Sequence, residues 1–189
     1  MSYNKIEYWN NRNDPNNDFC RSITHKHIKV VKPFITKNLN ILEYGPGIGR
    51  MTELYKNQSH INFFDISSKY EERLKQKCHD QDLKIQQHII QKDITTKTPF
   101  KDNEFDIVCA FEVLLHCPEY EIEEVMKELS RIGKKVIIIT WYKNGKTLNS
   151  GHCFTRNYKN LIKKNNLKLI HWDEDSFSSM PQVFYIYSE

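Results

Sequence analysis

The chain has 189 residues, of which 39% are hydrophobic, enough for one packed core but not for a second sizeable domain. Its formal net charge of +4 comes from lysines spread along the chain, which favours a solvated surface over a nucleic-acid interface without excluding one. The five cysteines show no C-x-x-C spacing, which argues against a disulfide framework and a zinc knuckle. The sequence shows neither a run of about 18 apolar residues nor a charged-then-apolar leader, so neither a membrane span nor a secretory signal is expected. We therefore expect one cytoplasmic domain.

Residues 1–37 read as a polar, turn-rich N-terminal extension to a domain of residues 38–189. The extension carries Tyr3, Tyr8 and Trp9, and aromatic side chains in a polar segment need a surface to pack against. Two arrangements stay open: a lid that closes over a ligand and shapes an acceptor pocket, or a helix that rests on the outside of the sheet. His25 and His27 are expected at the surface of a helix in this extension.

Residues 41–50, I-L-E-Y-G-P-G-I-G-R, predict a strand that feeds a tight turn and then opens a helix. Gly45, Gly47 and Gly49 can adopt positive φ, and without a Cβ they let backbone N–H groups lie against a ligand. Glu43 stands two residues ahead of the first glycine. This turn is typical of a cofactor-binding loop.

Further strands are expected at residues 60–67, 84–93 and 105–113, the last almost wholly apolar, as for a strand buried on both faces. The later elements are predicted as a helix from Pro118, a strand at 136–141, a helix at 157–166, and closing strands at 167–172 and 183–187. Alternating strands and helices predict an α/β fold with a parallel sheet.

The E-x-G-x-G-x-G spacing from Glu43 to Gly49, followed by Asp65 about twenty residues after the loop, resembles motif I of class I S-adenosylmethionine-dependent methyltransferases of the small type 11/12-like kind. The resemblance extends from about residue 38 to the C-terminus. It implies a Rossmann-like, doubly wound, seven-stranded and mostly parallel sheet, with helices on both faces and an antiparallel last strand. The spacing differs from the G-x-G-x-x-G of dinucleotide enzymes, so a nicotinamide-dependent oxidoreductase is less favoured.

The resemblance also implies S-adenosylmethionine as the cofactor and S-adenosylhomocysteine as the product. The glycine loop would hold the methionine part, Asp65 the ribose hydroxyls, and Asp93 would lie near the adenine amino group. The cofactor-binding residues expected on this basis are Glu43, Gly45, Gly47, Gly49, Asp65, Ile66, Asp93, Ile94 and Phe111.

Methyl transfer is a direct displacement, so proximity and orientation supply much of the acceleration, and a base is needed only when the acceptor is protonated. His116, after the fourth strand, and His152, in the polar loop after the fifth, are the candidate bases. The alternatives are a capping or packing role for His116 and an ordinary surface loop around His152. Substrate or lid contacts are expected from Tyr3, Tyr8, Trp9, Glu112, Tyr142 and Tyr158, and no metal ligands are expected.

Two motifs of related enzymes that are not seen in this sequence narrow the expected class of substrate. The segment after the fourth strand, F-E-V-L-L-H-C-P, lacks the Asn/Asp-Pro-Pro-aromatic motif of relatives that methylate exocyclic base amines or glutamine side chains, and the metal ligands of the catechol type are not apparent. We therefore expect metal-independent methyl transfer to an oxygen or nitrogen of a small molecule. A macromolecular substrate (tRNA, protein or a polysaccharide precursor) and a non-catalytic S-adenosylmethionine-binding protein of the same fold stay open, and the sequence gives no oligomeric state.

Overall fold

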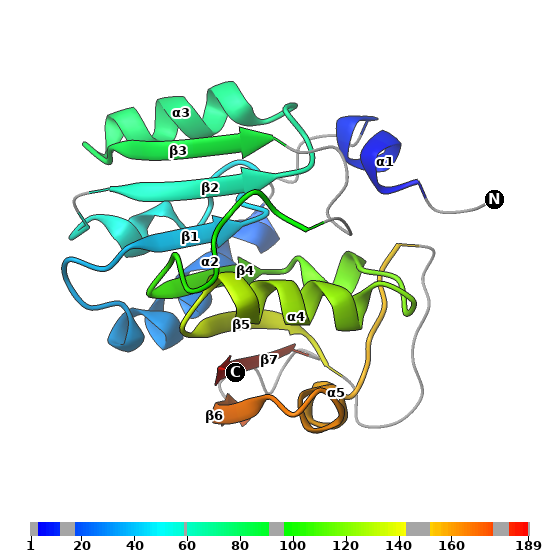
Figure 1. The fold of residues 1–189 in the computed structure, drawn as a ribbon. Helices are drawn as coiled ribbons and strands as arrows, with labels where there is room; N and C mark the ends of the chain where they lie inside the picture. Colours follow the sequence, from blue (N-terminus) through cyan, green and yellow to red (C-terminus); the bar gives the residue numbers. More distant parts are fainter. Residues whose placement is uncertain are drawn as a thin grey trace. The chain divides into compact units, whose positions relative to one another are not determined.

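The computed structural model describes residues 4–11, 18–58, 60–90, 97–142, 152–175 and 182–188. Their strands form a seven-stranded sheet with the order β3-β2-β1-β4-β5-β7-β6 (Figure 1). The last strand, β7, is antiparallel to both of its neighbours. The predicted Rossmann-like, mostly parallel α/β fold is therefore confirmed. The chain divides into two compact units, Met1–Asp93 and Ile94–Glu189.

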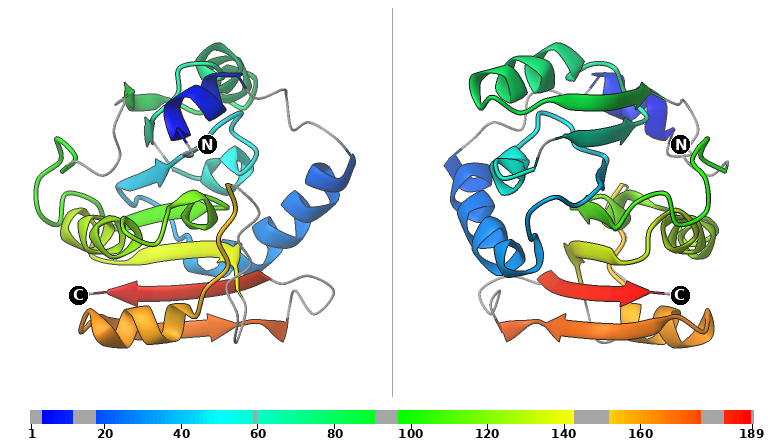
Figure 2. Two further views of the ribbon diagram at one scale, coloured as in Figure 1. Left: turned by 90° about the vertical axis from the view of Figure 1, so that its right-hand side faces the viewer. Right: turned by 60° about the vertical axis from the view of Figure 1, so that its left-hand side comes forward.

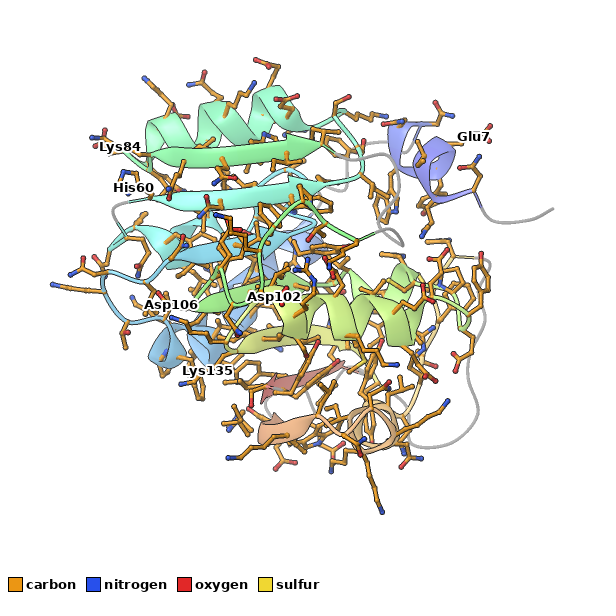
Figure 3. The ribbon with its side chains drawn as sticks, in the orientation of Figure 1. Glu7, His60, Lys84, Asp102, Asp106 and Lys135 are labelled. Atoms are coloured by element: carbon orange, nitrogen blue, oxygen red, sulfur yellow. The ribbon has the colours of Figure 1, made fainter. Side chains whose placement is uncertain are left out.

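In the first unit, the described residues form three parallel strands with helices around them. Its elements are α1 (Lys5–Asn11), α2 (Asp18–Val31), η1 (Lys32–Phe34), β1 (Ile41–Tyr44), η2 (Thr52–Tyr55), β2 (Ile61–Asp65), α3 (Glu71–Asp80) and β3 (Ile85–Ile90). Glu43 pairs with Phe63, and Phe63 in turn with His88, in parallel register. In Figure 3, His60 and Lys84 mark the end of this unit at which β2 and β3 begin. The carboxyl ends of the strands, with the glycine turn, therefore lie at the other end.

The expectation of a regular helix directly after the glycine turn is wrong. The chain makes further turns up to Met51 and then the short 3-10 helix η2. Gly47 and Gly49 both have positive φ, which interrupts the right-handed backbone that an α-helix needs. The Thr52 hydroxyl donates to the Gly49 carbonyl at 2.9 Å and closes this tighter turn.

In the second unit, the described residues form four strands and two α-helices. Its elements are β4 (Ile107–Phe111), η3 (Leu114–His116), α4 (Ile122–Ile132), β5 (Val136–Trp141), α5 (Tyr158–Lys164), β6 (Lys168–Asp173) and β7 (Gln182–Ser188). β4 pairs with β5 in parallel, and β7 joins β5 to β6 through antiparallel pairings. β4 is buried along its whole length, as its apolar sequence predicts.

Helix α4 lies along β4 and β5 (Figures 1 and 2). It begins at Ile122 rather than at Pro118, because the backbone N–H groups of Glu121 and Ile122 both donate to the Pro118 carbonyl in a preceding turn. Gly133 follows the helix where a Cβ atom would come within 2.5 Å of a Val108 methyl group. This close approach seats the end of α4 against the strand.

The proposed boundary between an extension of residues 1–37 and a domain of residues 38–189 stays a prediction, because the two compact units divide the chain elsewhere. Helices α1 and α2 belong to the first unit. None of the helices in the described parts of the chain has the length and apolar character that crossing a membrane requires.

Candidate functional site

The glycine turn follows β1, and its three glycines have the positive φ predicted for them: 73° at Gly45, 52° at Gly47 and 70° at Gly49. The Gly45 N–H donates to the Phe64 carbonyl at 2.7 Å, which joins the turn to β2. A Cβ atom at Gly47 would meet nothing within 4 Å, whereas one at Gly49 would lie 2.6 Å from a Leu74 methyl group. Gly47 therefore faces open space, where a ligand could approach the backbone, and Gly49 packs against α3.

Asp65 ends β2 and faces the same turn. Its carboxylate accepts hydrogen bonds from the backbone N–H groups of Gly47 and Ser67, each at 3.1 Å. Burial raises the pKa of Asp65, and these N–H donors offset part of that rise. The contact holds the loop after β1 against the end of β2, two segments that the sequence separates by 18 residues.

Glu43 lies beneath the turn and is 2% exposed. Burial raises the pKa of its carboxyl to about 7, although the Tyr55 hydroxyl and the cations of Arg50 and Lys77 act in the opposite direction. Its Oε2 atom accepts no hydrogen bond from the residues that the structure describes. The first unit thus holds a buried carboxyl with spare acceptor capacity at the glycine turn, where a ligand with a donor or a positive charge would be stabilised.

The expected surface position of His27 is wrong, because this side chain is fully buried. Arginine only donates, so the Arg50 Nη1 atom, 3.0 Å from His27 Nδ1, donates to an unprotonated ring nitrogen. The bond ties α2 to the residue that follows the last glycine. The four-residue spacing between His27 and the buried Val31 was the available sequence signal for this inward face.

The N-terminal extension also contacts the end of β2. The Ser67 hydroxyl, two residues beyond Asp65, forms a 2.7 Å hydrogen bond with Oδ1 of Asn10 at the end of α1. Tyr8 and Trp9 are half-buried and form an edge-to-face pair with ring centroids 5.1 Å apart. Figure 1 shows α1 beside the ends of β2 and β3. Of the other predicted residues, Ile66 is buried next to Asp65, while Tyr3, Asp93 and Ile94 lie outside the described residues.

In the second unit, β4 ends at Phe111, which is buried, and Glu112 follows with φ 61°, an uncommon backbone for a non-glycine residue. The Glu112 carboxylate accepts from Trp141 Nε1 at 3.1 Å and from Gln182 Nε2 at 2.9 Å. These two donors hold Glu112 at the carboxyl end of β4, the edge at which ligands bind in open α/β sheets.

The two predicted histidines are brought together. The rings of His116 and His152 stack with centroids 5.6 Å apart and planes 9° apart. His116 Nδ1 lies 2.8 Å from the His152 carbonyl oxygen and 3.8 Å from Cys153 Sγ. Because a carbonyl only accepts, Nδ1 carries the proton and Nε2 keeps the lone pair of His116.

Sequence reasoning missed Arg156, which fastens the segment after β5 to the loop after β4. Its side chain is 4% exposed and donates to the carbonyl oxygens of Leu114, at 3.0 Å, and Cys117, at 2.6 Å. The Phe154 N–H adds a bond to the Leu115 carbonyl at 2.7 Å. A single arginine in a loop carries no periodic or spacing signal, so only the fold reveals these contacts.

The two predicted tyrosines of this unit differ in their surroundings. Tyr142 is half-buried and meets Trp172 edge-to-face at 5.0 Å. Tyr158 is fully buried, its hydroxyl lies 3.3 Å from Thr140 Oγ1, and burial raises its pKa to about 12. Tyr142 is therefore accessible to a ligand, whereas Tyr158 belongs to the core.

Comparison with protein families identifies a methyltransferase domain at residues 42–138, just over half of the chain. This match spans the glycine turn, β2, β3 and β4 up to β5. A comparison with curated proteins gives no match.

Solved structures share the fold at low sequence identity. Magnesium protoporphyrin IX methyltransferase from Synechocystis PCC 6803, with bound S-adenosylhomocysteine, superposes with a TM-score of 0.73 at 14% identity, covering 96% of each chain. An S-adenosylmethionine-dependent methyltransferase from Leishmania major gives 0.79 at 15% identity, covering 97% of this chain and 81% of the other. The cyclase SpnF gives 0.71 at 12% identity, covering 94% and 85%.

Proposed function

This chain belongs to the methyltransferase domain family, and we propose that it transfers a methyl group from S-adenosylmethionine to an oxygen or nitrogen of a small molecule. One observation carries the proposal. At the end of β1, the open space at Gly47 adjoins the Asp65 carboxylate, which is itself bonded to the Gly47 N–H. A backbone that a ligand can approach and a carboxylate suited to hydroxyl groups thus occur together.

The residues of the first unit fit this cofactor. The sulfonium and ammonium groups of S-adenosylmethionine are cationic, and Glu43 offers a buried carboxyl whose Oε2 accepts no hydrogen bond from the described residues. The ribose carries two hydroxyl groups, and Asp65 offers oxygens that are oriented by two backbone N–H groups. Gly45, Gly47 and Gly49 would hold the methionine part, and Ile66 would supply an apolar surface.

Bound S-adenosylmethionine supplies an electrophilic methyl group with a good leaving group. The chain's own residues then need to orient the cofactor and the acceptor and to keep water away. Helix α1, fastened by the bond between Asn10 and Ser67, would cover the cofactor side with Tyr8 and Trp9. This reading makes the extension a lid.

Residues at the carboxyl end of β4 would serve the acceptor. His116 keeps an Nε2 lone pair because its Nδ1 proton is bonded to the His152 carbonyl, so it is suited to take a proton from a hydroxyl or ammonium acceptor. Glu112 and Tyr142 would contact the acceptor, and Phe111 would line the cofactor side. Tyr158 has a packing role in this proposal, since it is fully buried. Methyl transfer of this kind needs no metal.

Isothermal titration of the purified chain tests the proposal. We expect S-adenosylmethionine and S-adenosylhomocysteine to bind with micromolar affinity and NAD, the control ligand, to give no heat. Asp65→Ala should weaken binding by about 1–3 kcal/mol, the range for leaving hydrogen-bonding groups unpaired. Unchanged affinity in this variant would remove Asp65 from the site. Binding without turnover across a screen of small hydroxyl and amine acceptors would instead favour a macromolecular substrate or a non-catalytic role.

A further inference from the structure

Three side chains that can bind metal ions meet in the second unit. His116 comes from η3, and His152 and Cys153 come from the segment ahead of Arg156. One ligand atom from each residue lies within 4.8 Å of those of the other two. The three residues are half-buried, so a hydrated ion could reach them. This cluster was not predictable from the sequence, because His116 lies 36 residues ahead of the adjacent His152 and Cys153, and no C-x-x-C pair is present.

The fold holds the cluster together without help from a ligand. His116 and His152 are 36 residues apart in sequence, yet their rings lie face to face. The bond from Phe154 N–H to the Leu115 carbonyl and the two bonds from Arg156 to neighbouring carbonyls fix the segments that carry them. Segments that are already fixed lose less backbone entropy when an ion binds, so only the side chains need to reorient.

The hydrogen bonding of His116 is also that of a metal ligand. Its Nδ1–H donates to the backbone carbonyl of His152, which leaves Nε2 unprotonated. In metal sites, histidine commonly donates one ring N–H to a carbonyl or carboxylate while the other nitrogen binds the ion. An incoming divalent ion would meet two imidazoles and one thiol.

We propose that His116, His152 and Cys153 form a binding site for a borderline-soft divalent transition ion, of which Zn²⁺ is the natural probe. Two nitrogens and one thiolate are ligands that zinc takes readily, and water would fill a fourth, tetrahedral position. Zinc–nitrogen bonds of about 2.0–2.1 Å and zinc–sulfur bonds of about 2.3 Å place ligand atoms roughly 3.3–3.6 Å apart. The ligand atoms, within 4.8 Å of one another, therefore need to approach by about 1 Å, and one of the two nearly parallel imidazole rings has to turn so that its nitrogen faces the ion.

The ion would clamp the segment after β5 to the turn after β4. This site goes beyond the proposed methyl transfer, which needs no metal, and its test uses no S-adenosylmethionine. One consequence does rest on the proposed function. An ion on His116 Nε2 would occupy the lone pair that accepts a proton, so zinc would inhibit transfer to a protonated acceptor.

Zinc titration of the metal-free chain, in competition with a chromogenic chelator, tests the site. We expect one Zn²⁺ per chain, with affinity at least tenfold weaker in Cys153→Ser and in His152→Ala. His79→Ala is the matched control, because this exposed histidine lies in the other unit beside Asp80 and should leave zinc binding unchanged. Wild-type affinity in Cys153→Ser would overturn the proposal, as would the absence of stoichiometric binding.

Two further measurements test the thiolate ligand directly and distinguish loss of zinc binding from loss of the fold. With Co²⁺ in place of Zn²⁺, the wild type should show the visible bands of tetrahedral cobalt and a thiolate-to-cobalt charge-transfer band, and Cys153→Ser should lose the latter. Zinc should raise the thermal unfolding midpoint of the wild type. It should not raise the midpoint of Cys153→Ser or His152→Ala when the circular dichroism of the variant matches that of the wild type. An octahedral cobalt spectrum without the thiolate band would refute the site. Calorimetry with S-adenosylmethionine on the metal-free chain separates this failure from failure of the proposed function.

Discussion

The two compact units reach their candidate sites by different means. In the first, the features that matter are backbone features: three glycines at positive φ, N–H groups that point at Asp65, and a strand that places Glu43 beneath them. In the second, side chains such as His116 and Arg156 act on segments more than thirty residues away. A site built from local backbone geometry can be predicted from a short stretch of sequence. A site built from contacts between distant residues becomes visible only in the folded structure.

The largest effect is expected from removing Arg156, the residue that makes the long-range contacts of the second unit. Arg156→Ala leaves the Leu114 and Cys117 carbonyls without their buried donor and should lower the free energy of unfolding by about 3–5 kcal/mol. Urea denaturation measures the loss. Lys134→Ala, which breaks an exposed ion pair with Asp106, is the control and should cost less than about 1 kcal/mol. Equal effects would mean that the second unit does not depend on its long-range contacts.

In the first unit, a pH-dependent effect on stability is expected from the buried carboxyl of Glu43. Its pKa of about 7 in the folded state exceeds the ordinary 4.5, so the folded chain binds more protons between these values, and its stability falls as the pH rises from 4.5 to 7. Glu43→Gln removes the buried charge and should stabilise the protein by on the order of 3 kcal/mol at pH 8, with no gain at pH 4. The same variant should bind S-adenosylmethionine more weakly. A pH-independent difference in urea denaturation would contradict the assignment.

The glycines provide a matched pair within a single turn. Gly49→Ala forces a Cβ atom against Leu74 and should cost about 2–4 kcal/mol of stability from overlap and backbone strain together. Gly47→Ala meets open space and should cost only about 1–2 kcal/mol, the strain at positive φ. Its cofactor affinity, in contrast, should fall at least tenfold, about 1.4 kcal/mol. Thermal unfolding and calorimetry on both variants test whether structural and binding roles separate as described.

Local features of the structure could be predicted from the sequence, whereas long-range contacts could not. The strand at 136–141 matches β5, and the apolar run before Glu112 matches β4, because strands buried on both faces read as continuous apolar segments. The glycine turn was predictable because positive φ restricts residue type at a single position. The helix expected after it was not formed, since a local pattern does not show how the glycines interrupt the backbone.

The second site was predictable only in its parts. His116 and His152 were candidates for their residue type, but neither their stacking nor the approach of Cys153 could be foreseen, since the two segments meet only once the sheet has formed. His27 shows the same limit in the first unit. Its four-residue spacing from Val31 indicates an inward face, but its bond to Arg50, 23 residues away, could not be predicted from its own helix.

The bonds that Arg156 makes to Leu114 and Cys117 also set an order of events during synthesis. These carbonyls leave the ribosome 42 and 39 residues ahead of their donor, which at about 5–20 residues per second is a delay of roughly 2–8 s. Until Arg156 has emerged, its bonds to these two carbonyls cannot form. The half that contains the glycine turn is complete before this point, so the nascent chain acquires its cofactor residues first and its candidate metal ligands last.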